Sequence, residues 1–211
     1  MRLCYTWRDC FSFTLDDLPP TDIIEHPIVT KPRAVPIVRK PMRYSPSQKW
    51  YSDKVFGKVE AAAIISRGDS PYGAWTMFVR KLGEAAKALE ERTYRVVHDF
   101  RPVNADTVKS AYPYHNIETN LNDICIGKPT YYSKTDAKNG YWAIPIRPGD
   151  EWLTGFISPI GLFCYRRTAQ GLKNVPMTYA RFGDLVFGAL PERPGPTFRW
   201  GCGWCQTEGR G

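Results

Sequence analysis

One aspartate in this chain stands where a carboxylate could hold a metal ion. Asp136 ends a predicted strand over residues 131–136 and comes shortly before Gly140, so its side chain would lie at the edge of a sheet. Hard divalent cations prefer carboxylate oxygens as ligands. Taken alone, an aspartate at the end of a strand is more often a helix cap. The position of Asp136 by itself therefore leaves both roles open.

The cysteines give a weaker metal signal. Of the six, at positions 4, 10, 125, 164, 202 and 205, only Cys202 and Cys205 have a spacing typical of metal ligands. A zinc site needs a second pair of ligands nearby, and no histidine lies near this pair. We therefore expect free thiols rather than a zinc site or a disulfide scaffold.

The overall composition is typical of a globular protein, whose strands and helices could position such residues. Of its 211 residues, 43% are hydrophobic and 24% are charged, which argues against wholesale disorder. The longest unbroken apolar stretch, residues 61–65, is far shorter than the roughly 18 residues of a membrane span. The N-terminus lacks the apolar core of a signal peptide. We therefore expect an intracellular protein, in the cytoplasm by default, with the nucleus and the mitochondrion as open alternatives.

Positive charge gathers in one part of the chain. The net charge is +8, yet residues 1–30 hold two basic and five acidic residues, whereas residues 31–58 hold eight basic residues and one acid, Asp53. A basic block can attract a polyanion through counterion release. It can equally be a solvated surface, and charge alone does not decide between the two.

The first half of the chain predicts an extended leader followed by helices and strands. Six prolines interrupt residues 1–44 and exclude a regular helix there. Ser45-Pro46 is typical of a helix start, and the apolar spacing continues to a stop at Gly68. Residues 73–81 and 94–100 favour strands, whereas residues 83–92 and 117–126 favour helices.

The second half predicts strands over 131–136 and 143–146, a hairpin of 154–157 with 163–167, and a helix opened by Pro176. After Leu190 no amphipathic period survives, so residues 191–211 are predicted to be a disordered or adventitious tail. Because strands and helices mix without regular alternation, the pattern favours an α+β fold over a doubly wound sheet.

Four stretches match the sequence motifs of one enzyme family, and they occur in the same order. They are Tyr94-Arg-Val-Val-His-Asp-Phe-Arg-Pro-Val-Asn104, Ala111-Tyr-Pro-Tyr-His-Asn-Ile117, Thr135-Asp-Ala-Lys-Asn-Gly-Tyr-Trp-Ala-Ile-Pro145 and Gln170-Gly-Leu-Lys-Asn-Val-Pro176. Each resembles a motif of the reverse transcriptases of Ty3/gypsy-type LTR retrotransposons, and the likeness spans about residues 5–190. A single motif would be weak evidence, whereas four in the right order are highly specific.

This resemblance implies the fingers and a partial palm of a right-hand polymerase, with the thumb absent. Residues 1–44 would then be a leader similar to the linker between protease and polymerase, and residues 45–130 would form the fingers and the first approach to the palm. Residues 131–190 would form a partial palm with an inserted fingers hairpin, followed by the unrelated tail over 191–211.

The resemblance also implies roles for individual residues. Asp136 matches the family's first catalytic, metal-binding aspartate, and Arg95 matches the fingers arginine that contacts the incoming dNTP. The other residues implied at the dNTP are Ala137, Asn139, Gly140, Tyr141 and Gln170, and those implied near nucleic-acid phosphate are Lys173 and Arg181. Without the resemblance, Arg95 would be an exposed strand charge and Tyr141 a packing residue. Asp99 with Arg101 is predicted to be a structural ion pair, and His98 and His115 to serve packing or solvent roles.

The family's other two catalytic aspartates have no counterpart in the expected place. After Asp136 the only aspartates are Asp150, in a turn, and Asp184, in a helix, and no Tyr-x-Asp-Asp segment follows. One carboxylate cannot hold two Mg²⁺ ions against their mutual repulsion, and losing a member of a catalytic unit costs most of its rate.

We therefore predict a truncated RNA-directed DNA polymerase that is inactive in isolation. Its ancestral partners would be an RNA or DNA primer–template, dNTP and Mg²⁺. Two alternatives stay open. One is a non-catalytic nucleic-acid-binding remnant that uses the basic block and exposed aromatic side chains. The other is a decayed reading frame without function.

Overall fold

The computed structural model describes residues 6, 14–15, 18–40, 42–81, 88, 91–113, 118, 122, 137 and 139–187. Several predictions concern residues outside this set: the strand over 131–136 with Asp136, most of the helices over 83–92 and 117–126, His115, the cysteines other than Cys164, and the tail over 191–211. The chain divides into two compact units, Met1–Val108 with Lys138–Lys173, and Lys109–Ala137 with Asn174–Gly211. Most of the described elements belong to the first unit.

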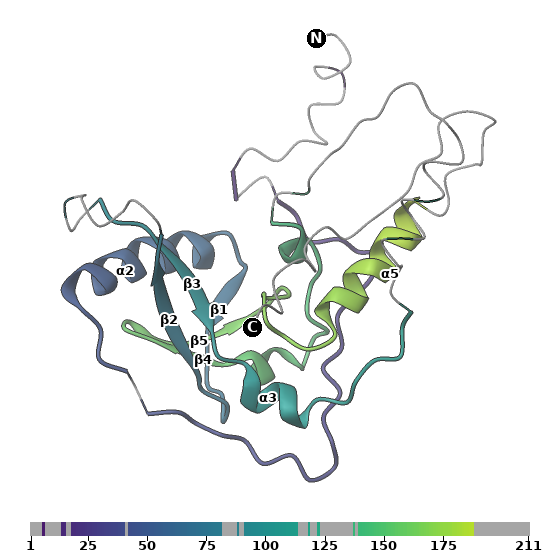
Figure 1. Ribbon diagram of the computed structural model, residues 1–211, viewed down its shortest axis with the longest axis horizontal. Helices are drawn as coiled ribbons and strands as arrows, with labels where there is room; N and C mark the ends of the chain where they lie inside the picture. The colour runs from purple at the N-terminus through teal and green to yellow at the C-terminus, as the bar shows by residue number, and fades with distance from the viewer. Residues whose placement is uncertain are drawn as a thin grey trace. The chain divides into compact units, whose positions relative to one another are not determined.

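Within the described residues, the first unit contains a five-stranded sheet in the order β1-β5-β4-β2-β3 (Figure 1). β2 runs parallel to β4, and the other neighbouring strands are antiparallel. This mixed architecture confirms the α+β prediction, and the predicted hairpin of 154–157 with 163–167 corresponds to β4 and β5. The strands are β1 (Ile65–Arg67), β2 (Ala74–Arg80), β3 (Tyr94–His98), β4 (Phe156–Ser158) and β5 (Gly161–Tyr165).

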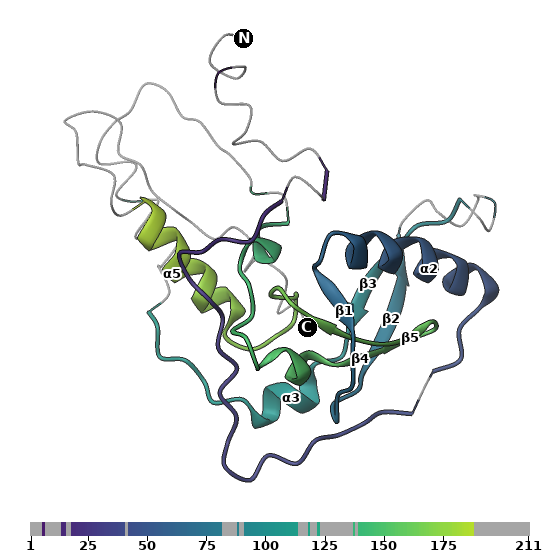
Figure 2. The same cartoon turned by 180° about the vertical axis from the view of Figure 1, so that it is seen from behind.

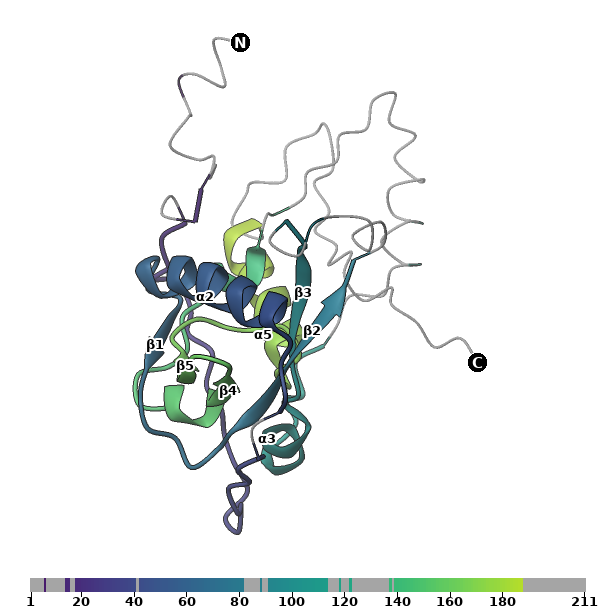
Figure 3. The ribbon, with the colours of Figure 1, turned by 90° about the vertical axis from the view of Figure 1, so that its left-hand side faces the viewer.

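Helix α2 (Pro46–Ala61) lies across one face of this sheet (Figures 1 and 3). A capping box starts it: the Gln48 backbone amide donates to the Ser45 hydroxyl, and the Ser45 backbone amide donates to the Gln48 side-chain oxygen at 2.9 Å. Two otherwise unpaired N–H groups are satisfied in this way. On the buried side of α2, the ring centroid of Phe56 lies 5.4 Å from that of Phe156 and 5.9 Å from that of Phe163. These rings form the core between helix and sheet.

The two faces of the β2–β3 hairpin differ in their surroundings. Phe78 and Tyr94 both contact Tyr51 of α2, with ring centroids 6.3 and 5.3 Å apart respectively, so α2 covers their face. Side chains alternate along a strand, and Arg95 is paired with Val79. Arg95 and Val79 therefore point to the opposite face, and both are exposed.

The leader is hydrogen-bonded to the first unit rather than detached from it. The backbone amides of Thr21 and His26 donate to carbonyl oxygens of residues 143 and 145, that of Lys31 to Asp106, and that of Arg39 to Gly73. The segment passes beside helix α3 (Arg101–Asp106), as seen from behind in Figure 2. The described residues 18–40 contain no helix, as their prolines predict. This part of the leader is a structural component of the unit.

The predicted end of the first helix is wrong. The helix ends at Ala61 rather than near Gly68, because Ala63 takes a left-handed backbone conformation with φ of 52°. Ile64 then becomes fully buried, and Ile65 opens strand β1. The burial of these two isoleucines against β5 replaces the last turn of the predicted helix.

The predicted strand over 143–146 is also wrong. The chain forms a 3-10 turn, η3 (Gly140–Ala143), and then single bridges that pair Pro145 with Arg167 and Ile146 with His26. The bridge to His26 is made by the leader, which lies far away in the sequence. Helix α3 and a second 3-10 turn, η4 (Glu151–Thr154), are short elements that the sequence did not predict.

Gly155 occupies the tightest backbone approach among the described glycines. A Cβ atom there would lie 2.3 Å from both the carbonyl oxygen of Tyr72 and the hydroxyl of Ser70. We expect Gly155→Ala to lower the free energy of unfolding by about 1–3 kcal/mol through overpacking, measured by urea denaturation. Gly57→Ala is the control: its Cβ meets open space on a helix, so it should stabilise by roughly 0.5–1 kcal/mol. Equal midpoints for Gly155→Ala and wild type would contradict this prediction.

The second unit contributes helix α5 (Val175–Phe187), which begins beside Pro176 as predicted. Just before it, Asn174 has a left-handed backbone with φ of 70°, and its side-chain oxygen accepts a hydrogen bond from the Ser110 amide at 2.9 Å. Among the described residues, no helix is long and apolar enough to cross a membrane.

Candidate functional site

Arg95, the arginine predicted to contact the dNTP, is accessible to solvent. Arg95 is exposed on the face of the β2–β3 hairpin that α2 leaves uncovered, and its partner Val79 is 51% exposed. On the same face, the Arg39 guanidinium lies 5.0 Å above the ring of Trp75. This face therefore combines cations with apolar surface. Contact between Arg95 and a triphosphate stays a prediction.

Two of the predicted dNTP segments lie side by side. Tyr141 is half-buried in η3, and its carbonyl oxygen accepts a hydrogen bond from the Thr168 hydroxyl. The Thr168 amide donates to the Ile144 carbonyl at 2.9 Å. Because Thr168 is two residues before Gln170, these bonds hold the Gln170 turn beside η3. Gln170 itself is exposed.

The Gln170 turn also abuts the end of β3. Gly171 has a φ of 91°, and a Cβ there would lie 3.8 Å from the His98 carbonyl and from the Phe100 ring. The Asn104 side chain donates to the Gly171 carbonyl at 2.7 Å. The strand that carries Arg95 and the turn that carries Gln170 thus belong to one packed assembly.

Three of the residues predicted to contact the dNTP, Ala137, Asn139 and Gly140, come just before or at the start of η3 in the sequence. Asn139 has a left-handed backbone with φ of 53°, which asparagine tolerates better than most residues. It caps η3 at Gly140, and the Trp142 amide donates to its carbonyl at 2.8 Å. Ala137 is exposed. Contact of these three residues with a dNTP stays a prediction.

Lys173 has a structural position that the resemblance did not indicate. Its ammonium donates to the carbonyl oxygens of Asn104 and Thr107, at 3.1 and 2.8 Å, at the C-terminal end of α3. A cation there is favourable because helix carbonyls concentrate negative charge at that end. Arg181 is an exposed residue of α5. Contact of either side chain with nucleic acid stays a prediction.

The two aspartates that follow Asp136 in the sequence, Asp150 and Asp184, both have protein partners. One carboxylate oxygen of Asp150 accepts from the Ile28 amide at 2.9 Å, and the same group pairs with Arg147 at 2.9 Å. Asp184 accepts from the Tyr112 hydroxyl, which raises the pKa of Tyr112. Within the described part of the chain, no three His, Cys, Asp or Glu side chains form a group that could hold a metal ion. Asp136 lies outside that part.

The predicted ion pair next to β3 is confirmed. Arg101 donates two hydrogen bonds to the Asp99 carboxylate, at 2.7 and 2.8 Å, and these bonds hold the pKa of Asp99 below its usual range. His98 is buried and bonds to the Thr76 hydroxyl at 3.1 Å and the Tyr165 hydroxyl at 2.9 Å. His98 thus has the packing role that the sequence predicted.

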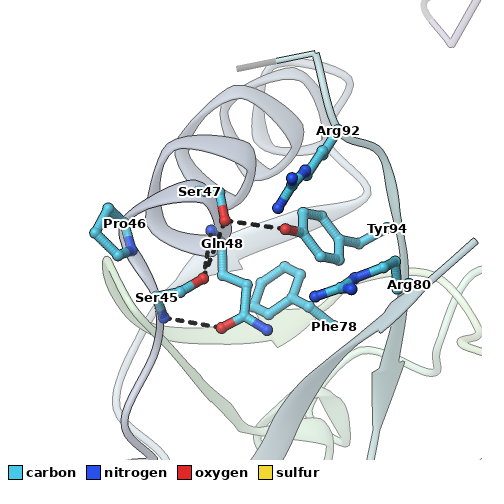
Figure 4. Close-up of a pocket in the computed structure, with 8 residues that line it drawn as sticks. All are labelled: Ser45, Pro46, Ser47, Gln48, Phe78, Arg80, Arg92 and Tyr94. Atoms are coloured by element: carbon cyan, nitrogen blue, oxygen red, sulfur yellow. Dashed lines mark hydrogen bonds between the residues drawn. The ribbon is translucent and has the colours of Figure 1, made fainter. Parts of the chain in front are cut away.

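A cavity that was not predicted from the sequence lies on the α2 side of the hairpin (Figure 4). It has a volume of about 470 Å³ and is lined by Ser45, Pro46, Ser47, Gln48, Phe78, Arg80, Arg92 and Tyr94. These residues come from the start of α2, from β2 and from the approach to β3. No local spacing signal marks such a site, because only the fold brings the three segments together.

The fold is similar to that of solved polymerases. A crystal structure of prototype foamy virus protease–reverse transcriptase matches 88% of this chain and 24% of that chain, at a TM-score of 0.74 and 23% identity. A foamy viral protease–reverse transcriptase in complex with RNA/DNA hybrid matches 90% of this chain and 24% of that chain, at a TM-score of 0.71 and 18% identity. At this level of identity the likeness defines a fold: the fingers and palm portion of a reverse transcriptase.

Sequence comparison defines the family. Residues 80–205 match the model of the reverse transcriptase (RNA-dependent DNA polymerase) family, and the chain belongs to this family. It is 31% identical over 127 residues to the retrovirus-related Pol polyprotein from transposon 297 of Drosophila melanogaster. That match covers 60% of this chain and only 12% of the polyprotein. The chain therefore corresponds to a small part of the curated relative that it matches.

Proposed function

We propose that this chain is the fingers and first palm portion of a Ty3/gypsy-type reverse transcriptase, and that it holds a primer–template and a dNTP for RNA-directed DNA synthesis. The observation that carries the proposal is the packing of the Gln170 turn against both η3 and the end of β3. It supports a shared binding site for Arg95, Tyr141 and Gln170. The foamy viral enzyme in complex with an RNA/DNA hybrid supports nucleic acid as the partner.

Nucleotidyl transfer in this site would need divalent ions held by carboxylates. Asp136 is the residue that would contribute to holding them. Asp150 and Asp184 are poor candidates to assist it, because Asp150 anchors the leader and Asp184 binds Tyr112. Bound Mg²⁺ would activate the primer hydroxyl and neutralise the leaving pyrophosphate. The described side chains supply binding and orientation only.

We expect these 211 residues, as a separate polypeptide, to give no templated incorporation in a primer-extension assay with Mg²⁺. The reason is that a single carboxylate cannot neutralise two divalent ions. A complete reverse transcriptase assayed in parallel shows that the assay works. Incorporation that follows the template and disappears in Asp136→Asn would overturn the proposed inactivity.

A second candidate function is nucleic-acid binding without catalysis. It is favoured by the exposure of the basic block over residues 31–58, in which every cation but Arg39 is exposed. Such a surface would bind nucleic acid with an affinity that falls steeply as salt rises. Titration of the wild-type chain with a labelled single-stranded oligonucleotide at several salt concentrations measures this dependence.

A further inference from the structure

The turn that carries Gln170 is anchored on both sides of that residue. Before it, Thr168 donates hydrogen bonds to the carbonyl oxygens of Tyr141 and Ile144. After it, Leu172 is buried, with only 5% of its surface exposed. Gln170 itself is exposed between these two anchors. The place of its side chain therefore depends on the contacts that hold the residues on either side of it.

Asn104 holds the second side of the turn with both ends of its amide. The side-chain nitrogen donates to the Gly171 carbonyl oxygen at 2.7 Å, and the side-chain oxygen accepts from the Lys173 backbone amide at 2.8 Å. A carbonyl can only accept and a backbone amide can only donate, so these partners fix the orientation of the Asn104 amide. An ionised aspartate of the same size could accept but not donate, and alanine could do neither.

Helix α3 connects this clamp to the strand that carries Arg95. The Asn104 backbone amide donates to the Phe100 carbonyl at 2.9 Å, and only two residues separate the end of β3 from the start of α3. Lys173 adds a second link, because its ammonium donates to the Asn104 carbonyl at 3.1 Å. All of these residues belong to the first unit. Asn104 thus joins the strand of Arg95 to the turn of Gln170.

We infer that Asn104 is a positioning residue for nucleotide binding, which fixes where the Gln170 side chain lies relative to Arg95. The inference rests on the proposed dNTP site and adds to it a residue outside the predicted set. Asn104 ends one of the four sequence motifs, but the resemblance assigned it no role. A contact group that is slightly misplaced loses its bond to a ligand even when the protein stays folded.

The sharpest test is Asn104→Asp, which keeps the size of the side chain and its bond from the Lys173 amide. Its second oxygen would face the Gly171 carbonyl, so two acceptors would meet where a donor met an acceptor. We expect the affinity of the full chain for labelled dATP to fall about tenfold, which corresponds to about one lost hydrogen bond. The affinity for a labelled primer–template should change by less than about twofold, because phosphate contacts elsewhere dominate it.

Asn104→Ala removes both side-chain bonds without adding charge, and it should weaken dATP binding to a similar extent. The matched control is Asn122→Asp, which adds the same charge at an exposed residue of the second unit. This control should bind dATP within about twofold of wild type, because screening limits the effect of distant charges. All variants are compared well below the lowest melting temperature of the set. Each is then folded, so a loss of stability alone would change neither affinity.

A double-mutant cycle shows whether Asn104 acts through Gln170. Gln170→Ala should itself weaken dATP binding about tenfold. Adding Asn104→Asp to Gln170→Ala should weaken it by less than about twofold further, because the contact that Asn104 positions is already gone. Repulsion between the new carboxylate and the triphosphate would instead weaken binding equally in both backgrounds.

The outcomes separate the positioning role from the broader function. If wild type binds dATP and both Asn104 variants bind it equally well, the positioning role is overturned and the proposed function stands. If Asn104→Asp costs as much affinity in the Gln170→Ala background, Asn104 does not act through Gln170 and the inference is wrong. If wild type binds the primer–template but no dATP, the inference fails with the dNTP part of the proposed function, and nucleic-acid binding stands. If it binds neither, both fail.

Discussion

Arg167→Ala is expected to lower the free energy of unfolding by about 3 kcal/mol, because it leaves several backbone carbonyls without their donor. Arg167 is only 7% exposed. Its guanidinium donates to the carbonyl oxygens of Leu18, of Ala62 at 3.2 Å and of Trp142 at 3.5 Å. One side chain thus joins the leader, the end of α2 and the η3 turn.

Burial without a carboxylate partner lowers the pKa of Arg167, which nevertheless stays protonated. Urea denaturation measures how much the free energy of unfolding falls in Arg167→Ala, and Arg166→Ala is the control. Arg166 is the exposed neighbour, and its replacement should change stability by less than about 0.5 kcal/mol. Arg167→Lys should fall in between, since an ammonium cannot reproduce the guanidinium fork. If Arg167→Ala were no less stable than Arg166→Ala, the bonding role assigned to Arg167 would be wrong.

Acidification should unfold the protein through two buried histidines. Burial lowers the pKa of His98 to about 3 and that of His26 to about 4, against an ordinary value of 6.5; nearby Asp150 raises the pKa of His26 in part. Below about pH 6.5 the unfolded chain protonates both imidazoles while the folded chain does not. The unfolded state then holds more protons, so stability falls as the pH falls.

Each histidine contributes about 1.4 kcal/mol per pH unit between its folded and unfolded pKa values. Together they should lower the free energy of unfolding by roughly 3–5 kcal/mol between pH 7 and pH 4.5, measured by urea denaturation across that range. His98→Gln keeps a polar side chain that does not titrate. It should therefore remove about half of the slope of the free energy of unfolding against pH. A slope identical to that of wild type would show that His98 does not control the acid response.

Local sequence patterns predicted the helices and strands that neighbouring residues determine. The hairpin of β4 and β5 follows from a tight turn around Pro159 and Gly161, and α5 follows from Pro176 and its apolar spacing. The end of α2 was missed because Ala63 carries no sequence signal for its left-handed backbone. The conformation accompanies the burial of Ile64 and the pairing of Ile65 with Tyr165 of distant β5.

In the candidate site, too, some residues were predicted from local motifs, whereas other features depend on the tertiary fold. The motifs predicted Arg95, Tyr141 and Gln170, and tertiary hydrogen bonds bring the latter two segments together. The structural position of Lys173 at the end of α3 was missed because α3 itself was not predicted. The cavity of Arg80 and Arg92 could not be found from sequence, since it exists only where a helix start meets two strands.

The strand order has a consequence for synthesis on the ribosome. In the sheet, β1 and β2 do not pair with each other, and β5 and β4 lie between them. Ile65 of β1 pairs with Tyr165 of β5, and Ala74 of β2 pairs with Phe156 of β4. As the nascent chain emerges from the exit tunnel, β2 and β3 can pair early, but β1 waits for about a hundred further residues. Until then its edge and the neighbouring apolar side chains stay open to other polypeptides. Completion of this sheet during translation therefore depends on the β4–β5 hairpin, whose strands are the last of the five to be synthesised.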